Sequence, residues 1–532
     1  MKRLFKIIPL MITPLVLTSC FVPIIFGSSS EEPYTPSYEP ASYSYDENAD
    51  YNVLPSLYKY RDYMEGNYFY LGSAPSTGEA SLLVVPIWFT DSSTYISNKN
   101  NVRSDIQKAY FGTSSETGWH SVKSYYETES RGRLIIDGTV TDWYECGKAS
   151  SKFYTEDTGA DATISLIDDV TAWYKKKYNV KDLTNFDKDK DGYVDSLMLI
   201  YAAPDYQAMD SSAANLWAYC YWKQEPSDRK VSDPGVNQFF WASYDFMYGS
   251  NRALLRTGKS SYYNGDTRYC SVDAHTYIHE MGHIFGLEDY YDYYTKTEYK
   301  PAAGFSMQDY NVGAHDPYSK FALGWADAIV PQRSCSLTLK PIESSGQFVL
   351  LTPSSDTSKV SAFDEYIILE LYTATGLNEF DSKYKYSGGY PQGPKASGVR
   401  VWHVDSRLLA IKSSSDSKFY GTLTNNPYDK SAYQGVTHAT SNSGGGDYGS
   451  NYAGSYDYNI LQLIRNSVTE TYKSKNELSS NDLFREGDSF RMSTYSSQFV
   501  NGSKLNSNKQ LGWEVNFGAI SNEGISLTIV KG

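Results

Sequence analysis

The sequence predicts an α+β domain followed by an all-β sandwich domain. Up to about residue 330, apolar runs typical of buried strands alternate with segments whose apolar residues recur at helical spacing. Beyond that point, short segments with β character recur and are separated by turn-rich stretches, as expected for a sandwich. The chain has 532 residues, so two or three domains are expected.

The first domain, at 78–330, is predicted to alternate strands with helices. Its predicted strands are rich in apolar residues and lie at 81–89, 133–138, 196–201 and 239–247. Its predicted helices lie at 102–111, 121–129, 160–178 and 316–325, with a further one starting near 271–274. The helix at 160–178 has apolar residues at helical spacing and three lysines in its last turn, which favour a helix C-terminus.

The second domain, at 331–532, is predicted to contain only strands. They lie at 336–339, 348–351, 365–371, 399–404, 489–492 and 525–530. A low-complexity stretch at 440–455 separates two of them. No internal repeat is visible.

The N-terminus predicts an export signal over residues 1–19. Three basic residues among the first six form its charged start, and the apolar core runs from Ile7 to Leu17. The sequence Leu-Thr-Ser-Cys that follows resembles the lipobox of bacterial lipoproteins. Cys20 would then be the lipidated first residue of the mature chain, which would attach the protein to a membrane.

An uncleaved membrane anchor is the alternative, because residues 21–26 are also apolar and nearly extend the run to spanning length. Three prolines weaken such a helix. In both cases the body of the protein is expected outside the membrane. Residues 20–77 are expected to form a lipidated tether, with a short pro-segment, a linker or a first strand from about residue 52 onward.

The net charge of the chain argues against one class of function, nucleic-acid binding. The formal net charge is −14, which argues against nucleic-acid binding because that function needs basic patches. The 50 tyrosines favour β-rich structure with half-buried positions.

Four cysteines besides the one in the lipobox allow up to two disulfides in an exported chain. The sequence does not decide the pairing among Cys146, Cys220, Cys270 and Cys335.

An aspartate-rich loop precedes the predicted strand at 196–201. Alternating aspartates before a glycine match the first half of an EF-hand loop, whose carboxylates converge on calcium. The twelfth position is Met198 instead of glutamate, so a helix–loop–helix is not implied, and a solvated acidic turn is the alternative. The candidate calcium ligands are Asp187, Asp189, Asp191, the carbonyl of Tyr193, and Asp195.

The stretch from His279 to Asp289 is the strongest candidate for a catalytic metal site. His279 and His283 are four residues apart and project from one helix face, so both imidazoles can bind one metal ion. Glu280 is rotated by roughly 100° from His279 and lies beside the metal instead of binding it. Gly286 can end the helix with a positive φ, and the turn can bring Asp289 back as a third ligand.

This set of donors predicts zinc-dependent hydrolysis. Zinc with three protein ligands keeps an open position for water and lowers the pKa of that water. Glu280 would take the proton and pass it to the leaving amine. Met307 would form an apolar floor below the ligands, and Tyr310 would either donate to the developing oxyanion or be structural. Glu288 is the alternative third ligand.

The remaining histidines are predicted not to bind the metal. His275, one turn before the motif, is expected to be a partner or surface residue. Structural or exposed positions are expected for His120, His315, His403 and His438.

Five stretches resemble the immune inhibitor A family of bacterial metallopeptidases (peptidase family M6). They are HEMGHIFGLEDYYD (279–292), DPYSKFALGW (316–325), DKDGYVD (189–195), SVKSYYETESRGRL (121–134) and GVRVWHVD (398–405). The resemblance covers roughly residues 80–330 and, more loosely, the β region. It implies a zincin or metzincin-like catalytic domain, zinc bound by two His and one Asp, a catalytic Glu, structural calcium and a following β-sandwich. Asp289 replaces the third His of the metzincin pattern.

We therefore expect a monomeric zinc endopeptidase that is attached to the cell surface and acts on extracellular proteins or peptides. A catalytically idle adhesin is one alternative, but the intact Glu280 and the three ligands argue against it. A glycan-binding lipoprotein is another, with exposed aromatic side chains of the β domain stacking on sugars. The tyrosine excess runs along the whole chain, so it does not single out that domain.

Overall fold

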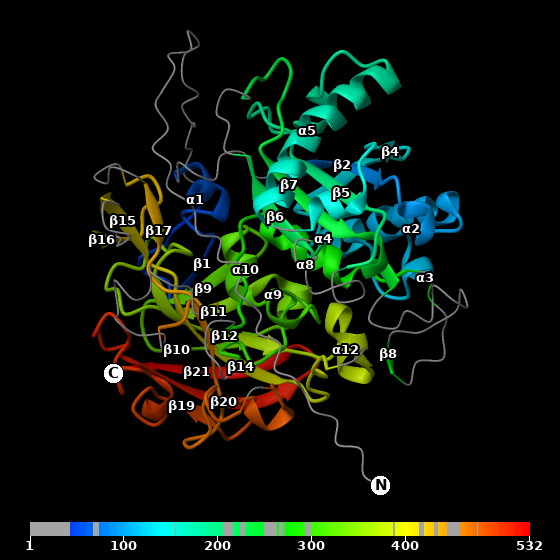
Figure 1. The fold of residues 1–532 in the computed structure, drawn as a ribbon. Helices are drawn as coiled ribbons and strands as arrows, with labels where there is room; N and C mark the ends of the chain where they lie inside the picture. The colour runs from blue at the N-terminus through cyan, green and yellow to red at the C-terminus, as the bar shows by residue number, and fades with distance from the viewer. Residues whose placement is uncertain are drawn as a thin grey trace.

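The computed structural model describes residues 43–66, 74–154, 156–205, 216–223, 229–248, 263–264, 270, 272–292, 299–386, 389–413, 420–429, 435–443, 458–475 and 477–532. Helices and strands are mixed along the chain, and the described strands form five sheets (Figure 1). None of the helices in the described ranges combines the length and the apolar character that a membrane crossing requires.

The sheet of the first domain is mostly parallel. Its strand order is β3 (Leu134–Val140), β2 (Gly78–Trp88), β5 (Ser196–Tyr201), β7 (Gln238–Ser243) and β6 (Tyr219–Trp222), and β4 (Tyr144–Glu145) also pairs with β2. Strands β3, β2, β5 and β7 are parallel, whereas β6 is antiparallel to β7 at the edge. The strand predicted at 239–247 is shorter than expected, because a 3₁₀ turn at Tyr244–Tyr248 replaces its second half.

Helices cover both faces of this sheet. Strand β2 is an almost continuous apolar run, and alternate residues of a strand point to opposite faces. Leu82 and Val84 therefore belong to one core, and Leu83 and Val85 to another. The first core includes residues of α2 (Lys99–Phe111), α4 (Val122–Glu129) and α8 (His275–Ile284). The second includes residues of α5 (Glu156–Tyr178).

Two further sheets form most of the C-terminal β region. The six-stranded sheet has the order β1 (Tyr51–Leu54), β9 (Asp327–Pro331), β11 (Gln347–Leu351), β12 (Glu365–Tyr372), β14 (Gly398–Asp405) and β18 (Leu461–Ile464). The four-stranded sheet has the order β10 (Cys335–Leu339), β21 (Gly524–Lys531), β20 (Trp513–Ser521) and β19 (Ser489–Phe490). Val349, Leu369, Val515 and Leu527 belong to one core between them, so the two sheets pack face to face.

The N-terminal described segment belongs to this β region. Strand β1 pairs antiparallel with β9 at the edge of the six-stranded sheet. The helix that follows, α1 (Tyr60–Gly66), packs with its Tyr60 ring against Phe363 of the β region and Tyr318 of the first domain. Of the three alternatives for residues after 52, a strand is the one that the structure contains at this point.

The first domain and the β region share a core. Phe348, Ile368 and Trp402 lie on the face of the six-stranded sheet opposite the sandwich core, and they belong to the same cluster as Ile278 and Met281 of α8. The six-stranded sheet therefore lies between the sandwich core and the first domain, below α8 and α10 in Figure 1. The predicted boundary at 330 falls inside β9, so no linker separates the two parts there.

The remaining elements are short. Short helices are α3 (Ser114–Thr117), α9 (Met307–Tyr310), α10 (Pro317–Ala322), α11 (Ile342–Ser345) and α12 (Glu379–Lys383). The other strands are β16 (Tyr420–Thr424), β15 (Leu408–Ser413) and β17 (Val436–His438) in one sheet, and β13 (Lys385–Tyr386) and β8 (Tyr263–Asn264) in another. Single 3₁₀ turns lie at Ser92–Thr94, Ser150–Phe153, Thr184–Phe186, Gly376–Asn378, Ser480–Asp482 and Ser496–Gln498.

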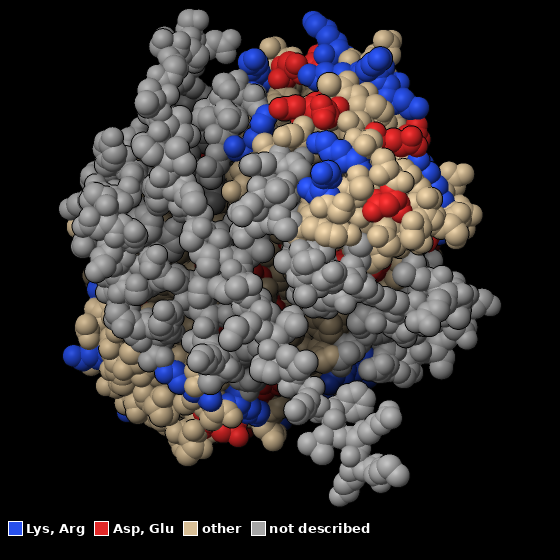
Figure 2. Space-filling model, in the orientation of Figure 1, with Lys and Arg blue, Asp and Glu red and all other residues tan. Residues whose placement is uncertain are grey.

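The described surface on the face shown in Figure 2 carries charges of both signs. Lysine and arginine side chains alternate with aspartate and glutamate around the part of the molecule where α5 lies. Lys175 pairs with Asp233 and Lys223 with Asp168, so part of the positive charge there is locally balanced.

Candidate metal centre

Three predicted metal ligands converge at the C-terminal half of α8. The Nε2 atoms of His279 and His283 are 3.2 Å apart. The Oδ1 atom of Asp289 is 3.1 Å from the first Nε2 atom and 3.4 Å from the second. One ligand atom from each residue lies within 4.8 Å of the others. The histidines meet in this way because residues four apart share a helix face.

Backbone carbonyl groups orient both imidazole rings. The Nδ1 atom of His279 donates to the carbonyl of Met307 at 2.7 Å, and the Nδ1 atom of His283 donates to the carbonyl of Leu287 at 2.7 Å. In the neutral tautomer with the proton on Nδ1, each Nε2 atom carries a lone pair. Two nitrogen lone pairs and a carboxylate oxygen then face one point. A divalent cation would stabilise this arrangement, and the donor set fits zinc.

A left-handed turn after α8 returns the chain to the metal ligands. Gly286 has a φ of 100°. Its N–H donates to the carbonyl of His283, and the N–H of Leu287 donates to the carbonyl of Gly282, which is the Schellman pattern of a helix end. A side chain at Gly286 would also press against Tyr60 of α1. The predicted helix end and the return of Asp289 are both present.

Asp289 and its neighbour Glu288 differ in their position relative to the two histidines. Burial acts to raise the pKa of Asp289, but the nearby imidazole groups of His283 and His279 hold it well below its usual range. Burial and the charge of Asp289 raise the pKa of Glu288 to about 7. Among the described residues, the group able to hold a metal contains Asp289 and not Glu288.

Glu280 is a buried carboxyl group beside these ligands. Its side chain belongs to the same turn of α8 as His279 and is 7% exposed. Burial raises the pKa of Glu280, and the negative charge of Asp289 acts in the same direction. The thiol of Cys220 on β6 donates to the Glu280 carbonyl at 3.1 Å, and its sulfur is 3.9 Å from Oε2. A carboxylate with a raised pKa is a stronger base, as proton transfer requires.

The turn at Ser306 and Met307 lies against α8. Met307 is fully buried and its carbonyl orients His279, as described above. The next residue, Gln308, packs over Gly282, where a methyl group would overlap its side-chain amide. Glycine at the second variable position of the histidine motif thus allows this turn to approach the helix closely.

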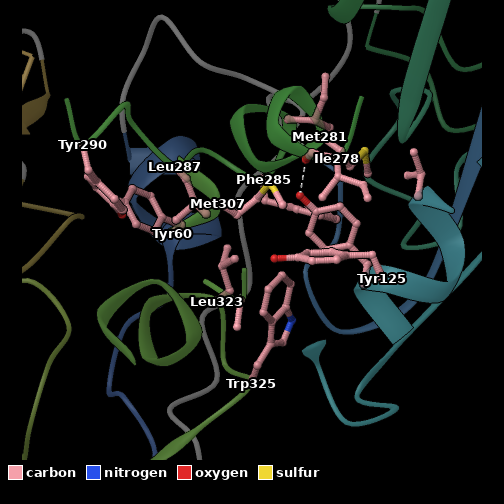
Figure 3. Close-up of a cluster of buried hydrophobic side chains, with 14 of the residues drawn as sticks. Tyr60, Tyr125, Ile278, Met281, Phe285, Leu287, Tyr290, Met307, Leu323 and Trp325 are labelled. Carbon is pink, nitrogen blue, oxygen red and sulfur yellow. Dashed lines mark hydrogen bonds between the residues drawn. The ribbon is translucent and has the colours of Figure 1, made fainter. Parts of the chain in front are cut away.

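Apolar side chains support α8 from below. The close-up in Figure 3 shows them converging from α8, from the turn after it and from α1. Those labelled are Tyr60, Tyr125, Ile278, Met281, Phe285, Leu287, Tyr290, Met307, Leu323 and Trp325. The hydroxyl of Tyr126 donates to the Ile278 carbonyl at 2.6 Å, one residue before the first ligand. The helix is therefore held rigidly on the side opposite the metal ligands.

The structure places the other histidines away from the ligand set. His275 is fully buried and stacks between Trp119 and Tyr386, with ring centroids 4.2 and 4.1 Å away. A surface position, one of the two alternatives for His275, is therefore wrong. His315, His403 and His438 are buried, whereas His120 is partly exposed.

The ring of Tyr310 lies beside Lys300. The Nζ atom of Lys300 is 3.6 Å from the centre of the Tyr310 ring, which is a cation–π contact. The ring also contacts Tyr291 and Tyr390 edge-on. These contacts fit the structural alternative given for Tyr310.

The aspartate-rich loop brings three of its four carboxylates together. One oxygen atom from each of Asp187, Asp189 and Asp195 lies within 4.8 Å of the others. The Asp187 carboxylate accepts hydrogen bonds from the backbone N–H groups of Asp191 and Gly192 at 3.0 Å each. Burial and neighbouring aspartates raise the pKa of Asp187 to about 6 and that of Asp195 to about 8. The loop leads into β5, so it is not part of a helix–loop–helix, as expected.

Asp191 lies outside this group of three. Its carboxylate pairs with Arg61 of α1 at 2.9 Å and with Arg229 at 3.8 Å. Arg61 also pairs with Asp189. Sequence spacing predicts Asp191 as a calcium ligand, and this stays a prediction; in the structure its carboxylate pairs with two arginines distant in sequence. Tyr193 is buried, and the guanidinium of Arg229 lies 5.4 Å from its ring centre.

Among the described residues, no disulfide joins any two of Cys146, Cys220, Cys270 and Cys335. Cys20, the predicted lipidation site, lies outside the described residues.

Sequence reasoning missed several residues that hold the site. Cys220, Gln308 and Asn442 carry no motif, and Asn442 lies in a low-complexity stretch. Arg400 lies in the family-like stretch at 398–405, and its guanidinium donates to the Phe305 carbonyl at 3.3 Å, next to the turn that carries Met307. Only proximity in the folded chain reveals these roles.

Comparison with known proteins gives one family. The model of the immune inhibitor A peptidase M6 catalytic domain matches residues 87–308, a range that contains every candidate metal ligand. A search of curated proteins finds no match.

Proposed function

Because the chain carries a catalytic domain of the immune inhibitor A peptidase M6 family, and so a metallopeptidase domain, we propose that it is a zinc-dependent endopeptidase of extracellular proteins. The ion is held by His279, His283 and Asp289, and Glu280 is the catalytic acid–base. The protein is anchored to the outer face of a membrane through Cys20.

One observation carries the zinc assignment. The two Nε2 atoms and the Asp289 carboxylate approach one another to between 3.1 and 3.4 Å. In the described part of the chain, neither Asp289 nor Glu280 forms a salt bridge with a lysine or arginine. Two neighbouring carboxylates, one of them buried, would be electrostatically costly without a cation beside them. Two His and one carboxylate are a donor set that zinc prefers.

The residues around the ion have separate tasks. When bound, zinc supplies a Lewis acid that polarises a carbonyl group and lowers the pKa of water. Glu280 accepts the proton of the attacking water and delivers it to the leaving nitrogen. Burial raises the pKa of Glu280, which makes the carboxylate a stronger proton acceptor. The backbone carbonyls of Met307 and Leu287 keep both imidazoles in the metal-binding tautomer.

The location is supported by the N-terminal sequence alone. The charged start, apolar core and lipobox at residues 1–20 support export and lipidation. Radiolabelled palmitate should enter the wild type and not Cys20→Ala. Absence of label in the wild type would remove the lipid anchor from the proposal.

Casein hydrolysis by the purified protein tests the enzyme assignment. We expect activity that a zinc chelator removes and that zinc restores, together with loss of activity in Glu280→Gln. Glu288→Gln is the matched control, because it neutralises a neighbouring carboxyl group that is not a proposed ligand. Equal activity of wild type and Glu280→Gln would reject the mechanism, and inactivity of the zinc-loaded wild type would reject the function.

A further inference from the structure

The residue that follows the third candidate ligand is held by three separate parts of the chain. The Tyr290 N–H donates to the carbonyl of Gln308 at 2.8 Å, and its hydroxyl lies 2.9 Å from the hydroxyl of Ser319. Its carbonyl accepts a 3.0 Å hydrogen bond from the side-chain Nδ2 of Asn442. Gln308 and Ser319 lie in the first domain, whereas Asn442 lies in the β region, far outside the matched range 87–308.

Asn442 is itself fixed by the neighbouring backbone. It is 1% exposed. Its Nδ2 atom donates to the Leu461 carbonyl at 2.7 Å, and its Oδ1 atom accepts from the Leu461 N–H at 3.0 Å. The N–H of Leu461 requires an acceptor, so the amide orientation is determined and its remaining donor faces Tyr290. With aspartate at position 442, a carboxylate oxygen would replace the Nδ2 atom. It would face the carbonyl oxygens of Tyr290 and Leu461, and both hydrogen bonds would be lost.

Asn442 contacts the residue that directly follows Asp289. On the other side of Asp289, the nearby Ser441 side chain acts to lower the pKa of Glu288. Asp289 lies beyond the last residue of α8, Ile284, so helix hydrogen bonds do not fix its position. The hydrogen bonds of the adjacent Tyr290 hold Asp289 in position instead.

We propose that Asn442 is a positioning residue for the metal centre, which keeps the Asp289 carboxylate within reach of both histidines. The metal centre of this protein thus extends beyond its family-matched catalytic domain and is incomplete without the β region. This inference rests on the proposed zinc site. It assigns Asn442 no contact with the ion or the substrate.

Partners of metal ligands typically change metal affinity by about 10–100-fold when they are removed. We expect Asn442→Ala to weaken zinc binding by a factor in this range, because Asp289 then moves relative to the histidines. Asn442→Ser keeps a hydroxyl for the Leu461 backbone but does not reach Tyr290. It should therefore weaken zinc binding similarly with less damage to the fold.

Zinc affinity of the full chain, measured by competition with a chromophoric chelator, tests this inference. Each variant is measured well below its own melting temperature, so that unfolding does not contribute. Asn506→Ala is the matched control. Asn506 is a buried asparagine of the same region, and its Nδ2 atom donates at 2.9 Å to Asp405, away from the metal ligands. The absorption spectrum of the cobalt-substituted protein reports ligand geometry independently of activity.

The expected result is weaker zinc binding and an altered cobalt spectrum in both Asn442 variants, with both properties unchanged in Asn506→Ala. Unchanged affinity in the Asn442 variants, or equal weakening in Asn506→Ala, would overturn the inference while leaving the zinc site in place. His283→Ala separates this outcome from failure of the proposed function. Wild-type zinc affinity that survives His283→Ala would mean that zinc binds elsewhere, and both proposals would fall.

Discussion

The hydroxyl of Tyr386 donates a 2.6 Å hydrogen bond to Oδ2 of Asp273. The other carboxylate oxygen of Asp273 lies 2.7 Å from Nδ1 of His275 and accepts from its backbone N–H at 3.0 Å. Since α8 begins at His275, a tyrosine of the β region fixes the carboxylate that caps the start of the metal-binding helix. Asp273 and His275 are 1% and 0% exposed, so water cannot replace these bonds.

Tyr386→Phe should therefore destabilise the protein by about 1.5–3 kcal/mol, the usual range for a lost hydrogen bond to a charged group. Urea unfolding measures the difference. Tyr372→Phe is the control, because it removes a bond to the neutral Pro394 carbonyl from another buried tyrosine of the β region. Its cost should be smaller, at about 0.5–1.5 kcal/mol. A larger cost for Tyr372→Phe would contradict the capping role of Asp273.

Glu280→Gln should lower kcat by about 10²–10⁴-fold, because the amide cannot accept a proton. Zinc content should stay unchanged, since Glu280 is not a proposed ligand. Metal analysis and casein hydrolysis of the same preparation measure both quantities. Loss of zinc together with activity would instead make Glu280 a part of the ligand set.

Gly282→Ala should destabilise the protein, although alanine normally favours a helix by about 1 kcal/mol over glycine. A methyl group there would overlap the side-chain amide of Gln308, which is fully buried and lies 3.3 Å from Nε2 of His315. We expect a cost of about 1–3 kcal/mol, typical of overpacking.

A double-mutant cycle with Gln308→Ala checks the cause of this cost. The double variant should recover part of the stability lost in Gly282→Ala, because the opposing side chain is gone. Strictly additive losses in urea unfolding would show that the two residues do not compete for space.

His438 should contribute stability that is lost as the pH decreases below about 6.5. Burial lowers the pKa of His438 from 6.5 to about 3 in the folded protein. Its ring packs against Tyr60, Tyr63 and Phe363. Between pH 6.5 and pH 3 the unfolded chain binds a proton that the folded chain does not. The contribution to stability is therefore lost at up to about 1.4 kcal/mol per pH unit as the pH decreases.

His438→Phe should remove this part of the pH dependence while keeping an aromatic ring in place. Urea unfolding between pH 7 and pH 5 gives the slope. Phe363→Leu disturbs the same cluster without a titrating group, so it should lower stability at every pH and leave the slope unchanged. An identical slope in wild type and His438→Phe would show that His438 is not the titrating residue.

Calcium should raise the melting temperature if the loop at 187–195 binds it, because a ligand of the folded state stabilises that state by mass action. Arg61→Gln should enlarge this effect, since Arg61 pairs with Asp189 and Asp191 and its charge opposes a cation. Melting curves with calcium, with magnesium and with a chelator measure it. Arg133→Gln is the control, because Arg133 pairs with Asp327 instead. If calcium does not change the melting curves, the loop at 187–195 is not a calcium site.

Much of the catalytic part could be predicted from local patterns. The predicted bounds of the helices at 102–111, 121–129 and 160–178 and of the strands at 81–89 and 196–201 all lie within four residues of the observed bounds. The spacing of apolar residues predicts these elements, and that spacing can be read within each helix or strand by itself. The ion pairs of Asp191 could not be predicted in this way, because Arg61 and Arg229 come from other parts of the chain.

The sequence by itself determined that the candidate metal ligands meet at one point. Spacing places His279 and His283 one turn apart, and Gly286 supplies the positive φ that returns Asp289. These are consequences of local backbone geometry. Only the tertiary structure decided what holds them: Asn442 on one side of the ligand loop and Tyr386 at the start of the helix. Their hydrogen bonds join residues more than 100 positions apart, and no local pattern encodes such a contact. The same reason explains why β1, near the N-terminus, completes a sheet of the C-terminal region.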